Sequence, residues 1–354
     1  MQLYNTVLSR NQIKAAVEML KAAAPITVLG DFGLNHQMPK KSTDTLVFRR
    51  VQPFGALQSA TGGAYQGTPR IVVSDFVLQE GVTPSPRTIN YVDVPVQLQQ
   101  WGVLFKFTSR AELLYEDDIP SDMTRVCGEA MAELLELVRY GVLRGGTNVV
   151  LANGSLRTDV NQPVTLSALR RAARVLEANR GQRVTRMLDP GPDYGVRSVG
   201  RSFIVFHHTD LTADIRGLAG FIRVEDYATH KPVHEREIGA VEDFRFVSSP
   251  LFTPFLQAGA VAPANTVLSN GAPSTGSNNA DVYPMLIVAQ DAWGQVALKG
   301  YNAIRPVVLP ATSVNHANPM GQFGYVGAST WFNAVRLNEN WMVRLECAAS
   351  ALVT

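Results

Sequence analysis

The stretch Gly195–Ser202 (GVRSVGRS) comes close to the phosphate-binding loop G-x-x-x-x-G-K-[ST]. In that loop the seventh residue is a Lys that reaches the β- and γ-phosphates of a nucleotide, whereas this chain has Arg201 there. The loop also leaves a strand and opens a helix. Here the stretch follows Pro190 and Pro192 and leads into a strand-like run, so its residue and its context both argue against a nucleotide site.

His230 and His234, with Glu235 and Glu237 beside them, have the composition of a metal site. Ligands four residues apart converge on one ion only from the same face of a helix, and Pro232 between the two histidines disfavours a helix. We therefore interpret this stretch as a loop with ordinary polar contacts.

The remaining candidate side chains are scattered. His207 and His208 are neighbours in a strand-like run, so their side chains point to opposite faces, and we expect one to be a hydrogen-bonded core histidine. Cys127 and Cys347 are too few for a disulfide framework or a cysteine-rich zinc site. No G-x-S-x-G nucleophile elbow occurs. The sequence thus predicts no catalytic residue, no cofactor site and no metal site. The aspartates that lack calcium-loop spacing are Asp75, Asp93, Asp117, Asp118 and Asp291.

The composition favours a folded protein with much of its surface covered by partners. Of 354 residues, 46% are hydrophobic and only 18% charged, with 28 Gly and 20 Pro. This length predicts two packed regions, or one core with long excursions. The net charge of +2 is too weak to indicate a dedicated nucleic-acid-binding protein. The N-terminus has no apolar run of signal-peptide type, so we expect folding in a cytoplasm.

One stretch is strongly basic. A helix is expected from Thr165 to about Arg180, with Leu166, Leu169, Ala173 and Leu176 on one side. The stretch Arg170–Arg186 could contact phosphates, which makes a nucleic-acid-binding protein the alternative function. No aromatic residues for base stacking are interleaved there, so a solvated or inter-subunit face is the favoured interpretation. Its arginines are Arg170, Arg171, Arg174, Arg180, Arg183 and Arg186.

The first half of the chain predicts extended structure without a core. A short helix with a capping box at Ser9 and Gln12 ends at Pro25. A long β-excursion then runs from Thr45 to about Phe107, and within it Val92–Gln99 alternates apolar and polar residues. A two-stranded ribbon is marginally stable by itself in water, so this one must lie against a neighbour.

The strongest predicted helix runs from Ser121 to Leu143 and would be roughly 35 Å long. Ser121 or Asp122 is expected to cap it, and Gly145–Gly146 to end it. The acidic run Glu116–Asp118 favours the positive end of the helix dipole. One apolar face is traced by Met123, Val126, Cys127, Ala130, Met131, Leu134, Leu137, Val138 and Gly141.

The second half of the chain predicts buried strands. Arg201–His208 (RSFIVFHH) is expected to be a buried strand, and Tyr283–Gln290 and Gln295–Gly300 are expected to flank a turn at Asp291–Gly294. Thr330–Leu337 and Trp341–Ala348 are expected to form a hairpin. With the helices above, this order predicts an α+β protein.

Several segments in the same order resemble a known family. They are Thr45–Arg50 (TLVFRR), Leu78–Pro84 (LQEGVTP), Tyr91–Gly102, Arg236–Ser248 (REIGAVEDFRFVS), Asn318–Val326 (NPMGQFGYV), Ala334–Leu337 and Trp341–Glu346. In these the chain resembles the major capsid proteins of phage N4-like viruses, a branch of the HK97-like capsid fold. It departs from them at Gly327-Ala328-Ser329, where relatives commonly have Gly-Trp-Lys.

The resemblance implies a domain organisation. The expected segments are an N-terminal arm (1–44), an extended E-loop with its flanking strands (45–107), a peripheral domain with a spine helix (108–150), an axial domain with loop insertions (151–325) and C-terminal strands that return to the core (326–354).

The resemblance also implies a function. A non-enzymatic subunit of this kind self-assembles into hexamers and pentamers of an icosahedral phage head around double-stranded DNA. The implied partners are other copies of the chain, scaffolding, portal and decoration proteins, and packaged DNA bound without sequence specificity. No membrane partner is expected. The implied location is the virion, after assembly in the cytoplasm of the host bacterium.

Overall fold

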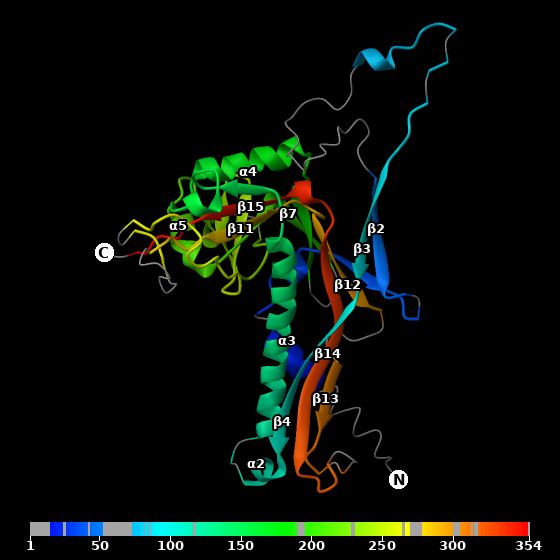
Figure 1. Ribbon diagram of the computed structural model, residues 1–354, viewed down its shortest axis with the longest axis vertical. Helices are drawn as coiled ribbons and strands as arrows, with labels where there is room; N and C mark the ends of the chain where they lie inside the picture. Colours follow the sequence, from blue (N-terminus) through cyan, green and yellow to red (C-terminus); the bar gives the residue numbers. More distant parts are fainter. Residues whose placement is uncertain are drawn as a thin grey trace. The chain divides into compact units, whose positions relative to one another are not determined.

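The computed structural model describes residues 15–23, 26–41, 43–51, 73–81, 83–84, 86–114, 116, 118–189, 195–227, 231–263, 266–269, 278–299, 305–312, 314 and 318–352 (Figure 1). For 186–189 and 195–199 it describes the backbone alone. The chain forms two compact units. Unit 1 combines Met1–Leu46, Val96–Val142 and Gly294–Val335, and unit 2 combines Val47–Pro95, Leu143–Trp293 and Arg336–Thr354.

Unit 1 is built on a five-stranded sheet whose middle strand is β14 (Phe323–Arg336). Its antiparallel pairing with β4 (Gln99–Thr108) is continuous over ten residue pairs, from Phe323↔Thr108 to Phe332↔Gln99. The other strands are β1 (Leu34–Met38), β12 (Trp293–Leu298) and β13 (Arg305–Leu309), and β1 pairs with β12 in parallel. Segments distant in sequence therefore form this sheet, as Figure 1 shows for β4, β13 and β14.

The predicted hairpin between Thr330–Leu337 and Trp341–Ala348 is wrong. The second segment forms β15 (Met342–Cys347), which pairs with β5 (Val149–Leu151) and β11 (Tyr283–Val288) in the sheet of unit 2. The short helix η6 (Glu339–Trp341) links β14 to β15. The edges of β14 are already paired with β4, β12 and β13, so the chain continues into the other sheet.

The long predicted helix is present as α3 (Ile119–Arg144) and begins earlier than expected. Asp118, rather than Ser121 or Asp122, precedes its first turn, and the Asp118 carbonyl accepts hydrogen bonds from the amides of both residues. Pro120 is accommodated because the first turn of a helix needs no intrahelical N–H donor.

The expected apolar face of α3 is only partly buried. Cys127 and Met131 pack into the core of unit 1, whereas Val126 and Leu137 remain 44% and 41% exposed. The N-terminal helix, described over 15–23, packs against α3 through the fully buried Met19. A Cβ at position 128 would lie 2.5 Å from the Met19 carbonyl oxygen, so Gly128 allows this close approach.

Unit 2 contains an eight-stranded mixed sheet. The strand order is β5-β15-β11-β7-β10-β9-β8, and β6 pairs with β7. The sheet packs against α4 (Leu166–Ala178), whose Thr165 hydroxyl accepts a hydrogen bond from the Ala168 amide as predicted for this helix start. The remaining strands are β6 (Val184–Asp189), β7 (Gly195–His207), β8 (Ile222–Arg223), β9 (Glu237–Val241) and β10 (Phe244–Ser248).

Short elements complete the two units. They are η1 (Leu29–Asp31), η2 (Val73–Phe76), α2 (Ser109–Leu114), η3 (Arg157–Asp159), η4 (Thr209–Leu211), α5 (Thr212–Arg216) and η5 (Val224–Asp226). The expected axial segment 151–325 is divided between the units. From Gly294 onward it belongs to unit 1, because β12 pairs with β1 and β13 pairs with β14.

Candidate interaction surface

The predicted ribbon consists of β2 (Thr45–Val51) and β3 (Tyr91–Gln97), which form a two-stranded sheet in the described part of the chain. Residues alternate between half-buried and exposed along both strands. On the exposed face Val47, Val51 and Tyr91 retain 50–60% of their accessible surface. These three apolar side chains share the face with the exposed Arg49 and Asp93, and contact with another surface would remove the apolar groups from water.

A cross-strand ion pair sets the register of the ribbon. The Arg49 guanidinium binds both carboxylate oxygens of Asp93, at 2.8 and 2.9 Å. It also lies over the Tyr91 ring, 5.8 Å from the centroid. The hydrogen bond and charge of Arg49 lower the pKa of Asp93 below its ordinary value. Both partners remain solvent-exposed, so the pair orients the strands but contributes little to stability.

A buried polar network in unit 1 contrasts with this pair. Glu136 accepts hydrogen bonds from the Leu29 amide at 3.0 Å and from Arg139 at 2.9 Å. Arg139 also donates to Gln295 at 2.8 Å, and Gln295 donates to the Gly30 carbonyl at 2.7 Å. The network therefore joins the segment before β1 to α3 and β12 within unit 1.

The arginine-rich stretch is largely used within the chain. Arg170 pairs with Glu242, and Arg171 donates to the Leu151 carbonyl. Arg183 makes a two-point ion pair with Asp243, both contacts at 2.8 Å, and also binds Glu177. The side chain of Arg186 lies outside the described residues. Arg170 and Arg183 are thus neutralised by carboxylates, which reduces the charge that the nucleic-acid alternative requires.

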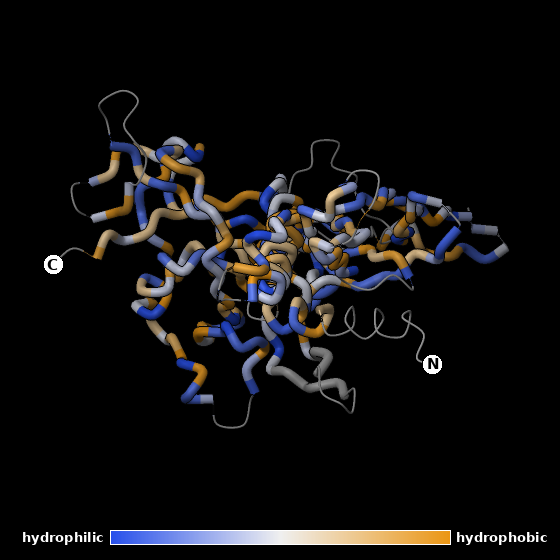
Figure 2. Tube along the Cα trace, turned by 90° about the horizontal axis from the view of Figure 1, so that it is seen from below, coloured by the Kyte–Doolittle hydropathy of each residue, from blue (hydrophilic) through white to orange (hydrophobic). Residues whose placement is uncertain are grey.

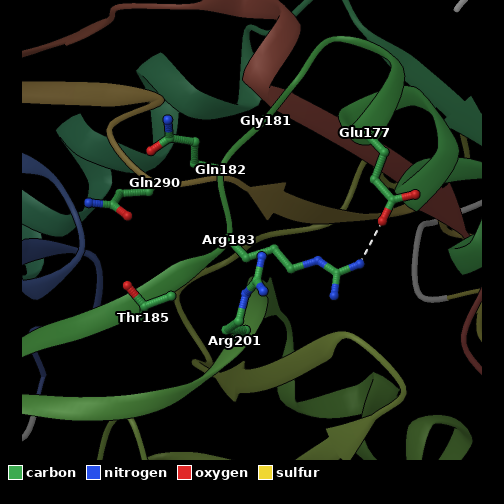
Figure 3. Close-up of a pocket in the computed structure, with 7 residues that line it drawn as sticks. All are labelled: Glu177, Gly181, Gln182, Arg183, Thr185, Arg201 and Gln290. Carbon is green, nitrogen blue, oxygen red and sulfur yellow. Dashed lines mark hydrogen bonds and ion pairs between the residues drawn. The ribbon is translucent and has the colours of Figure 1, made fainter.

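A cavity of about 640 Å³ lies beside the end of α4 (Figure 3). Its walls carry Arg183, Glu177 and Arg201, together with uncharged side chains such as Gln182 and Gln290. The dashed line of Figure 3 marks the Arg183–Glu177 ion pair at 2.6 Å. Because Arg183 already binds two carboxylates, Arg201 alone is left to attract an anion, which makes a weak binding site.

The near-match to a phosphate-binding loop is part of a strand. Gly195–Ser202 forms the first residues of β7 and pairs with β6, so no helix N-terminus follows it. Without that helix the backbone amides are not arranged to cradle a phosphate. The backbone of Gly195–Ser202 is therefore that of a strand and not that of a phosphate-binding loop.

In the segment that contains His230 and His234, the described residues make ordinary polar contacts, as expected. His230 lies outside the described residues, and the His234 ring accepts a hydrogen bond from the Arg236 amide at 3.0 Å. Glu237, the first residue of β9, is buried and accepts a hydrogen bond from the Tyr227 hydroxyl at 2.8 Å. Burial raises the pKa of Glu237, an effect that the sequence alone did not indicate. The described residues hold no cluster of three or more potential metal ligands.

His207 is a core residue that, in the described structure, has a hydrogen-bond partner at only one of its two ring nitrogens. It is fully buried, its Nδ1 lies 2.8 Å from the His208 carbonyl oxygen, and its Nε2 has no hydrogen-bond partner in the described structure. Burial lowers the pKa of His207 to about 4. His208 instead caps η4, and its side chain accepts a hydrogen bond from the Asp210 amide.

The reactive side chains that remain are separated from one another. Cys127 and Cys347 are both free and buried, and burial raises the pKa of Cys127 to about 11. Asp93 belongs to the ribbon and Asp118 to the start of α3, whereas Asp117 lies outside the described residues. None of the helices in the described part of the chain is long and apolar enough to cross a membrane.

Comparison with known proteins relates this chain to phage capsids. No family model matches the sequence. The chain is 22% identical over 271 residues to a protein of Pseudomonas phage KPP21 named major capsid protein, covering 72% of this chain and 67% of that protein.

Solved structures resemble the chain over nearly its whole length. The capsid of Ralstonia phage GP4 matches with a TM-score of 0.61 and 9% identity, covering 90% of this chain and 88% of that one. The capsid of cyanophage Pam1 matches with a TM-score of 0.58 and 13% identity, covering 93% and 92% of the two chains. The predicted fold class is therefore confirmed: the chain has the α+β, HK97-like fold of phage capsid proteins.

Proposed function

We propose that this chain is a major capsid protein, a structural subunit that assembles into the shell of a phage head and catalyses no reaction. The observation that carries the proposal is the β2–β3 ribbon, whose exposed side chains Val47, Val51 and Tyr91 would leave water on contact with a second surface. The capsid fold and the similarity to a phage major capsid protein support it.

The finer features of the shell belong to the same proposal. The chain would form hexamers and pentamers of an icosahedral head around double-stranded DNA, and it would be a capsid protein of the N4-like type. Scaffolding, portal and decoration proteins would be its partners, and assembly would take place in the host cytoplasm. The weak net charge supports DNA contacts without sequence specificity.

The expected domains map onto these elements as part of the proposal. The helix at 15–23 would belong to the N-terminal arm, the β2–β3 ribbon to the E-loop, α3 would be the spine of the peripheral domain, and the eight-stranded sheet would form the axial domain. Val326 and Ala328 of β14 share a core cluster with Cys127 and Met131 of α3, which supports a C-terminal segment that returns to the peripheral domain.

Negative-stain microscopy and analytical ultracentrifugation of the expressed full-length chain test the proposal. Wild-type protein should form large particles or capsomers. The variant Val51→Asp with Tyr91→Asp should remain unassembled, because two charges would be buried without partners at the contact. The matched control places two charges at the exposed Leu256 and Val261 (Leu256→Asp with Val261→Asp) and should assemble. A small soluble wild-type species, or particles formed equally well by the ribbon variant, would refute the proposal.

A further inference from the structure

The side of α3 that faces away from the core of unit 1 carries an apolar row. We call Val126, Ala130, Leu134 and Leu137 the outer stripe; their spacings of four, four and three residues place them on one helix face. Val126 and Leu137 are 44% and 41% exposed, and the other two are half-buried. Figure 2, in which α3 is seen nearly end-on, shows hydrophobic residues along this helix. The row is about 17 Å long, or three helical turns.

An acidic row runs beside the outer stripe. Glu129 and Glu133 follow Val126 and Ala130 by three residues, and Asp122 lies on the same side two turns before Glu129. Within the described part of the chain, none of these three carboxylates has an ion pair or a side-chain hydrogen bond. The sequence from Ile119 to Val138 contains a single cation, the exposed Arg125, so the surface beside the stripe is negative.

The outer stripe and the acidic row together indicate which kind of partner would bind this face of α3. An apolar row with spacings of three and four residues is the surface that another amphipathic helix covers, and unpaired carboxylates along one side attract Lys or Arg side chains. The occupant should therefore be a helix with an apolar stripe bordered by cations.

The described helices of this chain do not offer such a surface. In α4 the apolar residues Leu169 and Leu176 are fully buried, so its exposed side presents arginines without an apolar stripe. The helix at 15–23 exposes Val17 and Leu20, but Glu18 offsets the charge of its one cation, Lys21. The six-residue α2 exposes Leu113 and Leu114, but Glu112 offsets the charge of Arg110. A second copy of the chain, in the part that the structure describes, therefore lacks the complementary helix.

From these observations we propose that the outer stripe and acidic row of α3 bind a basic amphipathic helix of a different polypeptide. One such contact is small and would be weak. Resting on the proposed function, the same face recurs on every subunit of a shell, so a partner with several such helices would bind by avidity.

A binding experiment with a designed probe tests the charge and helix requirements together. The probe is a fluorescein-labelled peptide of three heptads that repeats Leu, Lys, Lys, Leu, Leu, Lys, Lys, and its counterpart has Glu in place of every Lys. Fluorescence anisotropy against the unassembled full-length chain should show binding of the lysine peptide that weakens with salt. The variant Glu129→Lys with Glu133→Lys should weaken it about tenfold and make the glutamate peptide the better ligand.

The control variant makes the same charge change elsewhere. Glu225→Lys with Asp226→Lys alters two exposed carboxylates of η5 in unit 2 and should leave the affinities for both peptides unchanged. Thermal unfolding of each variant establishes that it is folded. A simple folding defect would weaken binding without inverting the preference between the two peptides.

Three results would overturn the inference. The first is equal affinity of wild-type protein for the two peptides, and the second is an equal loss of binding in the control variant. The third is a failure of the Glu129→Lys, Glu133→Lys variant to assemble in the absence of any peptide, because a second copy of the chain would then occupy this face. If the peptide fails to bind while wild-type particles still form, the helix site is refuted and the capsid function stands.

Discussion

The eight-stranded sheet of unit 2 and the β2–β3 ribbon are built from similar apolar residues but have opposite solvent exposure. All six residues of β11 are buried, and the Phe203–Phe206 run of β7 is fully covered. In the ribbon, Val47 and Val51 are half-exposed on two strands that, among the described residues, pair with no third strand. The sheet is thus stabilised within one chain, whereas the ribbon leaves apolar surface for a contact that a single chain does not provide.

Two arginine–carboxylate pairs show the same contrast. Glu136 and Arg139 are buried in unit 1 and hold further hydrogen bonds, whereas Arg49 and Asp93 make a well-oriented pair in water. Burial lowers the pKa of Arg139, which the neighbouring Glu136 partly opposes. Losing one partner is therefore costly only in the buried pair.

The largest effect is expected in the sheet. Phe206 is fully buried and lies edge-on to Phe252, with 6.2 Å between the ring centroids. Phe206→Ala should lower the free energy of unfolding by about 3–5 kcal/mol. Urea denaturation of the unassembled chain measures this loss, and a loss below about 1 kcal/mol would contradict the description of this sheet as a tightly packed core.

The second effect concerns the buried ion pair. Glu136→Gln leaves the Arg139 guanidinium buried without its countercharge and should cost about 3 kcal/mol of unfolding free energy. Asp93→Asn in the ribbon is the matched change and should leave the unfolding midpoint unchanged, because Arg49 stays hydrated. Similar denaturation curves for the two variants would remove the distinction between the pairs.

The third effect is a pH dependence that originates in the sheet. The pKa of His207 is about 4 in the folded protein and near 6.5 when unfolded, so the unfolded chain binds a proton first as the pH falls. Stability should drop by about 2 kcal/mol between pH 7 and pH 5 through this group, and the contribution ends near pH 4. His207→Phe should flatten that part of the stability profile, whereas His234→Asn should retain it. An unchanged slope in the His207 variant would exclude the buried histidine as its source.

The smallest effect on stability is expected in the ribbon. Tyr91→Ser should change the unfolding free energy of the isolated chain by less than about 0.5 kcal/mol, since the side chain is 60% exposed. The same variant should slow or prevent particle formation in sedimentation experiments. A large loss of stability in the unassembled chain would instead mean that the ribbon already packs within its own subunit.

Local patterns in the sequence identified most elements correctly. Thr165 and the spacing of Leu169 and Leu176 predicted α4, and the period-two run at Val92–Gln99 predicted a strand of the ribbon. These signals are local, because a cap or an amphipathic period depends on residues within one or two turns. The absence of a helix after Gly195–Ser202 also followed from nearby prolines and apolar residues.

Partner choice between distant segments was decided only by the tertiary structure. The sequence predicted a hairpin after Thr330–Leu337, but β14 pairs with β4 and β15 pairs with β11 in different sheets. A local pattern does not show with which distant strand a segment pairs. Along α3 the nine apolar positions look like one face in the sequence. Packing of Met19 on Gly128 buried Cys127 and Met131 and left Val126 and Leu137 outside, because only contacts across the fold determine which side of a helix meets the core.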